Sequence, residues 1–144
     1  MLQRDPSKKF APGMWTGIGG KYEGDEEPLA GAARELREET GLTTPLREFA
    51  RCSVNGGQKI LYYFWGELDA DTTPTCNEGT LHWIEMHQVL GKDIIPTTRV
   101  VLEEWAKRDF APDKHFTVLL IRNDANDAGS TQQSVVIQEG LHNA

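Results

Sequence analysis

The hydrophobic pattern of the chain changes period along its length, which predicts a mixture of helices and strands. A helix is predicted over residues 28–40, because proline suits a first helical turn and Gly41 suits the position after the last. Its apolar residues recur at helical spacing on one face, which we expect to dock on a core: Leu29, Ala32, Ala33 and Leu36. A second helix is predicted over residues 97–108.

Short apolar runs between turn residues predict the strands. They are residues 14–18, 47–54, 59–68, 80–85, 116–121 and 134–138, and residues 86–90 are predicted as a single helical turn. Residues 55–58, Asn-Gly-Gly-Gln, would join the second and third of these strands as a hairpin. Residues 62–65 are all aromatic and occupy both faces, so this strand is predicted to be central. A mixed sheet with helices on its faces is the natural assembly.

Composition narrows the class of protein only in part. A chain of 144 residues suits one domain, residues 1–144, with a substantial core. The formal net charge of −7 argues against a binder of polymeric nucleic acid, which usually carries a basic surface. No apolar run approaches the ~18 residues of a membrane helix, and a signal-peptide core is lacking, so we expect a cytoplasmic protein with no membrane partner. Cys52 and Cys76 are predicted to be small buried residues.

The most informative chemistry lies on the first predicted helix. Glu35, Glu38 and Glu39 are related by steps of three and four residues, so at about 100° per residue they share one face. Like charges at this spacing repel one another and do not stabilise an ordinary surface helix. A hard divalent cation, Mg²⁺ or Mn²⁺, would turn this repulsion into coordination. It would also mediate the approach of a phosphorylated substrate to an acidic protein.

These glutamates belong to a longer pattern over residues 20–42. The chain resembles the Nudix hydrolases, whose box reads G-x5-E-x7-R-E-U-x-E-E-x-G-U with U a bulky aliphatic residue. Every specified position is filled: Gly20, Glu26, Arg34, Glu35, Leu36, Glu38, Glu39, Gly41 and Leu42. The resemblance implies an α/β Nudix fold, with a mixed sheet between helices, and cleavage of nucleoside diphosphates linked to another group.

The beginning of the chain departs from the family pattern. Members have a full apolar strand before the segment that matches residues 2–5, and here Met1 leaves a shortened first strand. An incomplete gene model or an internal start would explain this, and alternatively the C-terminal strands would cover the vacant edge. An uncovered edge would present unpaired backbone groups and favour association, for instance as a homodimer.

The resemblance also implies a set of metal ligands. Carried over residue by residue, the ligands are the carboxylates of Glu35, Glu38 and Glu39 and the backbone carbonyl of Gly19. Adjacent glycines would let the backbone approach a cation closely. Arg34 would orient a carboxylate through a bidentate pair, with Glu26 as the expected partner.

A further carboxylate is expected outside the box. Residues 78–83 resemble the arrangement E-G-x-U-x-W found before a tryptophan-bearing strand in the family, and this makes Glu78 the candidate. It would bind a second metal ion or act as general base. The base that activates water is therefore left open between Glu35 and Glu78, because clustered carboxylates titrate together.

The substrate expectation rests on residues 15–21. This segment resembles the W-x-G-x-G-G-K variant of MutT-like enzymes, which remove oxidised purine nucleotides such as 8-oxo-dGTP by releasing a monophosphate and pyrophosphate. The expected substrate contacts are Trp15, Gly20, Lys21, Thr97 and Thr98. Two threonines depart from the acidic or amide side chains that some of these enzymes use to read the base. ADP-ribose or another nucleoside diphosphate is the rival substrate, and a nucleotide- or protein-binding domain without catalysis is the rival class.

Overall fold

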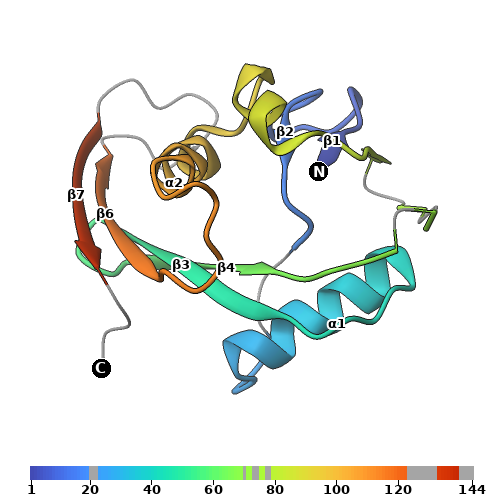
Figure 1. The fold of residues 1–144 in the computed structure, drawn as a ribbon, viewed down its shortest axis with the longest axis horizontal. Coiled ribbons are helices and arrows are strands. Elements are labelled where there is room, and N and C mark those ends of the chain that lie inside the picture. The colour runs from blue at the N-terminus through green and yellow to red at the C-terminus, as the bar shows by residue number, and fades with distance from the viewer. Residues whose placement is uncertain (20–22, 70, 73–74, 77–78, 123–132, 140–144) are drawn as a thin grey trace. The chain divides into compact units, whose positions relative to one another are not determined.

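The computed structural model describes residues 1–19, 23–69, 71–72, 75–76, 79–122 and 133–139 (Figure 1). The chain divides into two compact units. The first comprises Met1–Arg47 and Trp65–Ile94, and the second comprises Glu48–Phe64 and Ile95–Ala144. Within the described ranges, no helix is both long enough and apolar enough to cross a membrane.

The first unit contains a small antiparallel sheet of strands β1 (Leu2–Arg4), β2 (Trp15–Thr16) and β5 (Gly79–Leu81). Their order is β2-β1-β5, so the three-residue β1 has a neighbour on each side. The first strand is short, as predicted. Its two edges are covered by β2 and β5, and the C-terminal strand pairs elsewhere.

Gly79 allows β5 to lie unusually close to β1. A Cβ atom at this position would come within 2.0 Å of the Gln3 carbonyl oxygen, which is far inside van der Waals contact. The glycine also pairs with Arg4 in the strand register. The glycine of the E-G-x-U-x-W segment is therefore required for strand pairing, whatever the role of the glutamate before it.

Helix α1 (Pro28–Thr40) has the predicted bounds. It ends in a left-handed glycine, because Gly41 has φ of 75° and donates its N–H to the Arg37 carbonyl at 2.8 Å. The prediction that Leu29 docks on a core is wrong, since this residue is 50% exposed. It lies in the first turn of the helix, where fewer neighbours cover a side chain, and the buried positions of α1 are Gly31 and Thr40.

The first unit is completed by η1 (Met86–Gly91), a 3₁₀ helix where a single helical turn was predicted. The segment after η1 attaches to β2. The Trp15 N–H donates to the Asp93 carbonyl at 2.9 Å, and Trp15 forms a parallel bridge with Ile94. Residues 17–19 then lead from β2 toward α1 (Figure 1).

The second unit is built on a four-stranded mixed sheet in the order β4-β3-β6-β7. Its strands are β3 (Arg47–Val54), β4 (Lys59–Trp65), β6 (Phe116–Arg122) and β7 (Gln133–Glu139). Strands β3 and β6 are parallel, with Ala50 opposite Phe116, whereas β6 and β7 are antiparallel. The mixed sheet is the one predicted from the sequence.

The prediction that the aromatic strand is central is wrong, because β4 lies at an edge of this sheet. Two of its aromatic residues contact side chains of β3 instead. Tyr63 lies against Phe49 with ring centroids 6.2 Å apart, and Tyr62 lies under the Arg51 guanidinium at 5.0 Å. Tyr62 and Tyr63 are thus partly buried although β4 is an edge strand.

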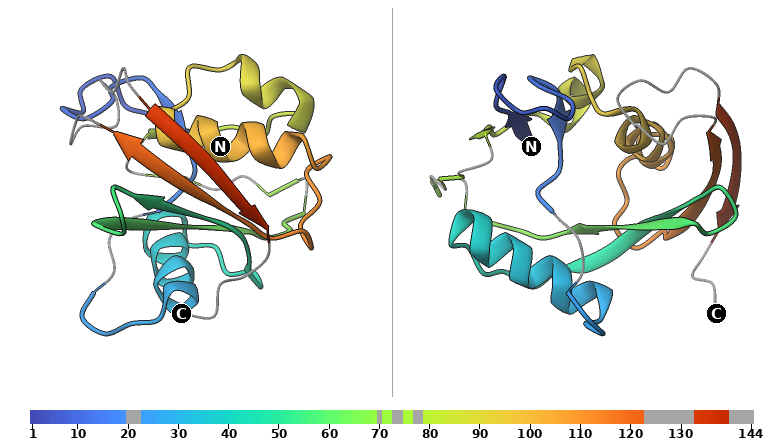
Figure 2. Two further views of the ribbon diagram at one scale, coloured as in Figure 1. Left: turned by 90° about the vertical axis from the view of Figure 1, so that its left-hand side faces the viewer. Right: turned by 180° about the vertical axis from the view of Figure 1, so that it is seen from behind.

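Helix α2 (Pro96–Ala106) lies over one face of the sheet (Figure 2). Trp105 stacks on Phe49 with centroids 3.9 Å apart, and its indole N–H donates to the Ala111 carbonyl at 3.0 Å. The largest fully buried side chains are Phe116, Leu120, Val101, Val118, Thr97 and Cys52. Cys52 is buried as predicted, but the same prediction is wrong for Cys76, which is partly exposed.

Candidate metal and nucleotide site

The candidate site is organised around Arg34, which comes from the middle of α1. Its Nε donates to Glu26 Oε2 at 3.0 Å and its Nη2 donates to Glu26 Oε1 at 2.8 Å. Both side chains are mostly buried, with 13% exposure for Arg34 and 18% for Glu26. This is the bidentate pair expected from the sequence, and it fixes the plane of the guanidinium.

The remaining nitrogen of Arg34 gathers carboxylates from the same helix. Nη1 lies 2.9 Å from Glu38 Oε2 and 3.1 Å from Glu35 Oε1. Glu23, in the turn before α1, contributes a longer contact of 3.4 Å. One guanidinium therefore offsets the mutual repulsion of glutamates that helical spacing places on one face. Because Glu35 and Glu38 each use one oxygen here, their orientation depends on Arg34.

This arrangement changes the acidity of the groups involved. The Arg34 hydrogen bonds, together with the Glu23 N–H that donates to Glu26 at 2.8 Å, lower the pKa of Glu26 from 4.5 to about 2. The same pair raises the pKa of Arg34 above its ordinary value. Glu26 therefore remains ionised throughout the neutral range.

A prediction for stability against pH follows from Glu26. A carboxyl whose pKa is lower in the folded state stabilises the fold above its unfolded pKa, and this contribution is lost as pH falls through the folded value. The stabilisation from Glu26 should therefore disappear between pH 4.5 and about 2. We expect Glu26→Gln to be less stable at neutral pH and to lose less stability over this range, as measured by urea unfolding at stepped pH.

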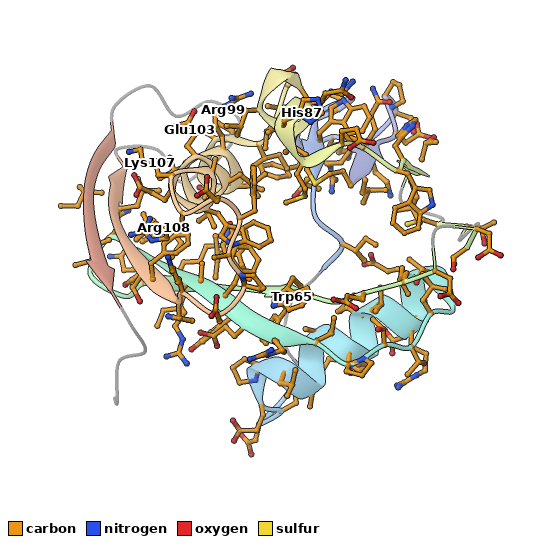
Figure 3. The ribbon with its side chains drawn as sticks, in the orientation of Figure 1. Trp65, His87, Arg99, Glu103, Lys107 and Arg108 are labelled. Carbon is orange, nitrogen blue, oxygen red and sulfur yellow. The ribbon has the colours of Figure 1, made fainter. Side chains whose placement is uncertain are left out.

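The exposed Glu103 of α2 provides the matched control for this experiment, since its side chain is 51% exposed (Figure 3). Glu103→Gln should follow the wild-type profile. If wild type and Glu26→Gln lost stability in parallel down to pH 2, the Arg34–Glu26 pair would not be the acid-sensitive element.

Glu39, the last of the box glutamates, borders a hollow at the end of α1. Its Oε2 atom is buried, and the hollow has a volume of about 500 Å³. Arg37, Glu38, Thr40, Gly41, Thr75 and Cys76 line the same hollow. Two of the three predicted ligands of the helix, Glu38 and Glu39, thus border one open space.

The donor chemistry of these residues fits a hard divalent cation. Carboxylate oxygens are the ligands that Mg²⁺ and Mn²⁺ take in proteins, and Arg34 contacts Glu35 through Oε1 and Glu38 through Oε2. Gly19 is exposed, and its missing side chain leaves open space around the backbone. Among the residues that the structure describes, no three metal-binding side chains already converge on one point.

Several predicted site residues are either outside the described part of the chain or in the second unit. Gly20, Lys21 and Glu78 lie outside the described residues. Thr97 and Thr98 belong to α2 in the second unit, where Thr97 is fully buried and Thr98 is 8% exposed. The Thr98 hydroxyl lies 3.4 Å from the Tyr63 hydroxyl. Their role in base recognition stays a prediction.

Trp15 lies in β2 and is contacted by two residues that the sequence did not single out. The His82 ring lies 4.7 Å from the Trp15 ring at a tilt of 40°, and the Lys92 ammonium lies 5.1 Å from the ring centroid. Strand pairing and the bridge after η1 assemble this cluster from three separate segments. Sequence spacing carries no signal for such a contact.

The first unit also has a larger hollow, which is lined by other residues than the one beside Glu38 and Glu39. It has a volume of about 680 Å³ and is lined by residues between Leu42 and Arg47 and between Trp65 and Thr72. None of the predicted site residues that the structure describes lines it. The carboxylates around Arg34 are therefore a better guide to the chemistry than the size of the hollow.

The family of the chain follows from comparison with known proteins. The model of the NUDIX domain matches residues 1–105, which include the whole box and the Arg34 cluster. The chain therefore belongs to the Nudix family.

Two relatives of named activity resemble the chain. It is 32% identical over 114 residues to an 8-oxo-(d)GTP phosphatase of Mycolicibacterium smegmatis, covering 76% of this chain and 34% of that protein. It is 28% identical over 106 residues to a CTP pyrophosphohydrolase of Escherichia coli, covering 72% of this chain and 78% of that protein. The chain thus spans about a third of the first relative and most of the second.

Solved structures agree with the α/β fold. The MutT protein of Bacillus halodurans gives a TM-score of 0.63 at 20% identity, with 93% of this chain and 86% of that chain covered, which supports the fold alone. The MutT protein of Methanosarcina mazei gives a TM-score of 0.60 at 26% identity, with 76% and 83% covered. The predicted Nudix fold is confirmed.

Proposed function

We propose that this chain is a divalent-metal-dependent hydrolase that cleaves a nucleoside triphosphate to a monophosphate and pyrophosphate, with Mg²⁺ or Mn²⁺ as cofactor. We also propose that residues 1–144 act together as one catalytic domain. The observation that carries this proposal is the Arg34 cluster. In this cluster Glu26, Glu35 and Glu38 surround one guanidinium. Glu39, which follows Glu38 on α1, borders the same hollow as Glu38.

In this proposal the residues of the site act as ligands of the cation, as an orienting arginine and as a general base. Glu35, Glu38, Glu39 and the Gly19 carbonyl hold the cation, with Glu78 as a further ligand. The chemistry supplied by a bound divalent cation is withdrawal of charge from phosphoryl oxygens and activation of water. Arg34 orients Glu35 and Glu38 through one oxygen of each. The proton of the attacking water passes to a carboxylate oxygen of Glu35 or Glu78.

The two relatives described above support a triphosphate substrate over ADP-ribose. Both have names that specify a nucleoside triphosphate, one an oxidised purine and the other CTP. We place 8-oxo-dGTP first, because the segment around Trp15 also resembles the MutT-like pattern. We place CTP second, because the alignment covers most of the CTP pyrophosphohydrolase. A binding domain without catalysis is the remaining alternative, and the complete set of box glutamates disfavours it.

The test is hydrolysis of a nucleotide panel with product analysis. The panel contains 8-oxo-dGTP, dGTP, CTP and ADP-ribose with Mg²⁺, and chromatography separates monophosphate, pyrophosphate and phosphate. We expect monophosphate and pyrophosphate, released fastest from 8-oxo-dGTP. Preference for CTP would replace the purine assignment, and preference for ADP-ribose would overturn the substrate class while keeping the metal site. A folded sample that turned over none of these nucleotides would contradict the proposed function.

A further inference from the structure

We propose that Lys92 is a substrate-binding residue whose ammonium group, held on the Trp15 ring, contacts an oxygen of the β- or γ-phosphate of the nucleotide. This inference rests on the proposed function, because it assumes that the chain binds a nucleotide. It assigns a cationic contact to a part of the first unit that lies outside the box.

The position of Lys92 is set by the end of η1. Its backbone N–H donates to the Val89 carbonyl at 3.1 Å, and its own carbonyl accepts the Ile94 N–H at 3.0 Å. The side chain extends over Trp15, where the ammonium lies 5.1 Å from the ring centroid. A cation–π contact of this kind restricts a flexible lysine, so less freedom remains to be lost when a ligand binds.

The tryptophan beneath it is fixed from two sides. The Trp15 N–H donates to the Asp93 carbonyl at 2.9 Å, and the residue pairs with Gln3 across the sheet. Residues 92–94 and strand β2 are therefore tied together by backbone bonds. Strand β2 continues directly into residues 17–19, so Lys92 is attached to the strand that leads to the Gly19 carbonyl proposed for the metal.

The neighbours of Trp15 favour a phosphate contact over stacking of the base on this ring. Both Lys92 and His82 already contact the ring, so a base stacking there would have to displace one of them. The ammonium is a compact point charge suited to phosphate oxygens. It is also well placed in a chain with 22 acidic and 15 basic residues, where a polyphosphate approaching the glutamates needs local positive charge.

The decisive experiment compares binding of a triphosphate and a monophosphate. Calorimetry with Mg²⁺ would use a non-hydrolysable dGTP analogue and dGMP against wild type, Lys92→Met and Lys92→Arg. We expect Lys92→Met to weaken triphosphate binding about tenfold or more, the typical effect of losing one charge-assisted hydrogen bond. The loss for dGMP should be clearly smaller, and Lys92→Arg should remain close to wild type.

Lys107→Met is the matched control, because Lys107 is an exposed lysine directly after α2 that pairs with Glu104 at 2.7 Å (Figure 3). Lys92→Gln is the second variant if Lys92→Met does not fold. Unchanged affinity in a folded Lys92 variant would overturn the inference. An equal loss for triphosphate and monophosphate would also overturn it, since this would indicate a contact to the base, the sugar or the α-phosphate. If wild type bound neither nucleotide, the proposed function itself would fail.

Discussion

Replacing Glu39 or Glu38 by glutamine should lower kcat by orders of magnitude while the fold is retained. Glutamine keeps the shape of the side chain but removes the negative charge that a divalent cation requires. The loss should exceed the roughly 10–100-fold effect typical of removing an outer partner of a metal ligand. The measurement is steady-state hydrolysis of 8-oxo-dGTP at saturating Mg²⁺, with circular dichroism to confirm the fold.

The control for these variants is Glu103→Gln on α2, where an exposed glutamate pairs with Arg99 at 3.7 Å. Its activity should stay close to wild type. Near-normal turnover in both Glu38→Gln and Glu39→Gln would remove the basis for placing metal on this face of α1.

Replacing Arg34 by lysine should give the second large effect. Lysine keeps the positive charge but cannot make the bidentate pair with Glu26 while also contacting Glu35 and Glu38. The glutamates would then lose their common orientation. We expect kcat and the affinity for Mn²⁺ to fall about 10–100-fold, as for other residues that orient metal ligands.

The affinity for Mn²⁺ would be measured from the loss of the free-ion signal in electron paramagnetic resonance, because this signal does not depend on turnover. Arg99→Lys is the matched control, because Arg99 forms an ion pair at 3.7 Å with Glu103, an exposed residue of α2 (Figure 3). Wild-type Mn²⁺ affinity together with wild-type kcat in Arg34→Lys would show that the Arg34 contacts do not orient the ligands.

The local elements of the fold were predictable because their signals lie within a few residues of one another. The bounds of α1 follow from a proline, a glycine and helical spacing, and the predicted strand over residues 47–54 is observed as β3. The Arg34–Glu26 pair was also predictable, since the box fixes both positions. In each case short-range geometry decides the outcome.

The features that depend on distant segments were not predictable in this way. The position of β4 at a sheet edge depends on which strands pair, and aromatic content alone indicated the opposite. The contacts of His82 and Lys92 with Trp15 require three segments to meet, so no spacing in the sequence encodes them. The exposure of Leu29 likewise depends on which other segments pack against the first turn of α1, and helical spacing does not specify them.

Dependence of turnover on a divalent cation tests the central claim most directly. The purified chain would be treated with a chelator, freed of it, and assayed with 8-oxo-dGTP, dGTP and CTP as Mg²⁺ is titrated back. The account predicts no turnover without metal and saturable restoration by Mg²⁺, with monophosphate and pyrophosphate as products. Equal turnover with and without Mg²⁺ would contradict the claim, as would a folded protein that Mg²⁺ and Mn²⁺ both fail to activate.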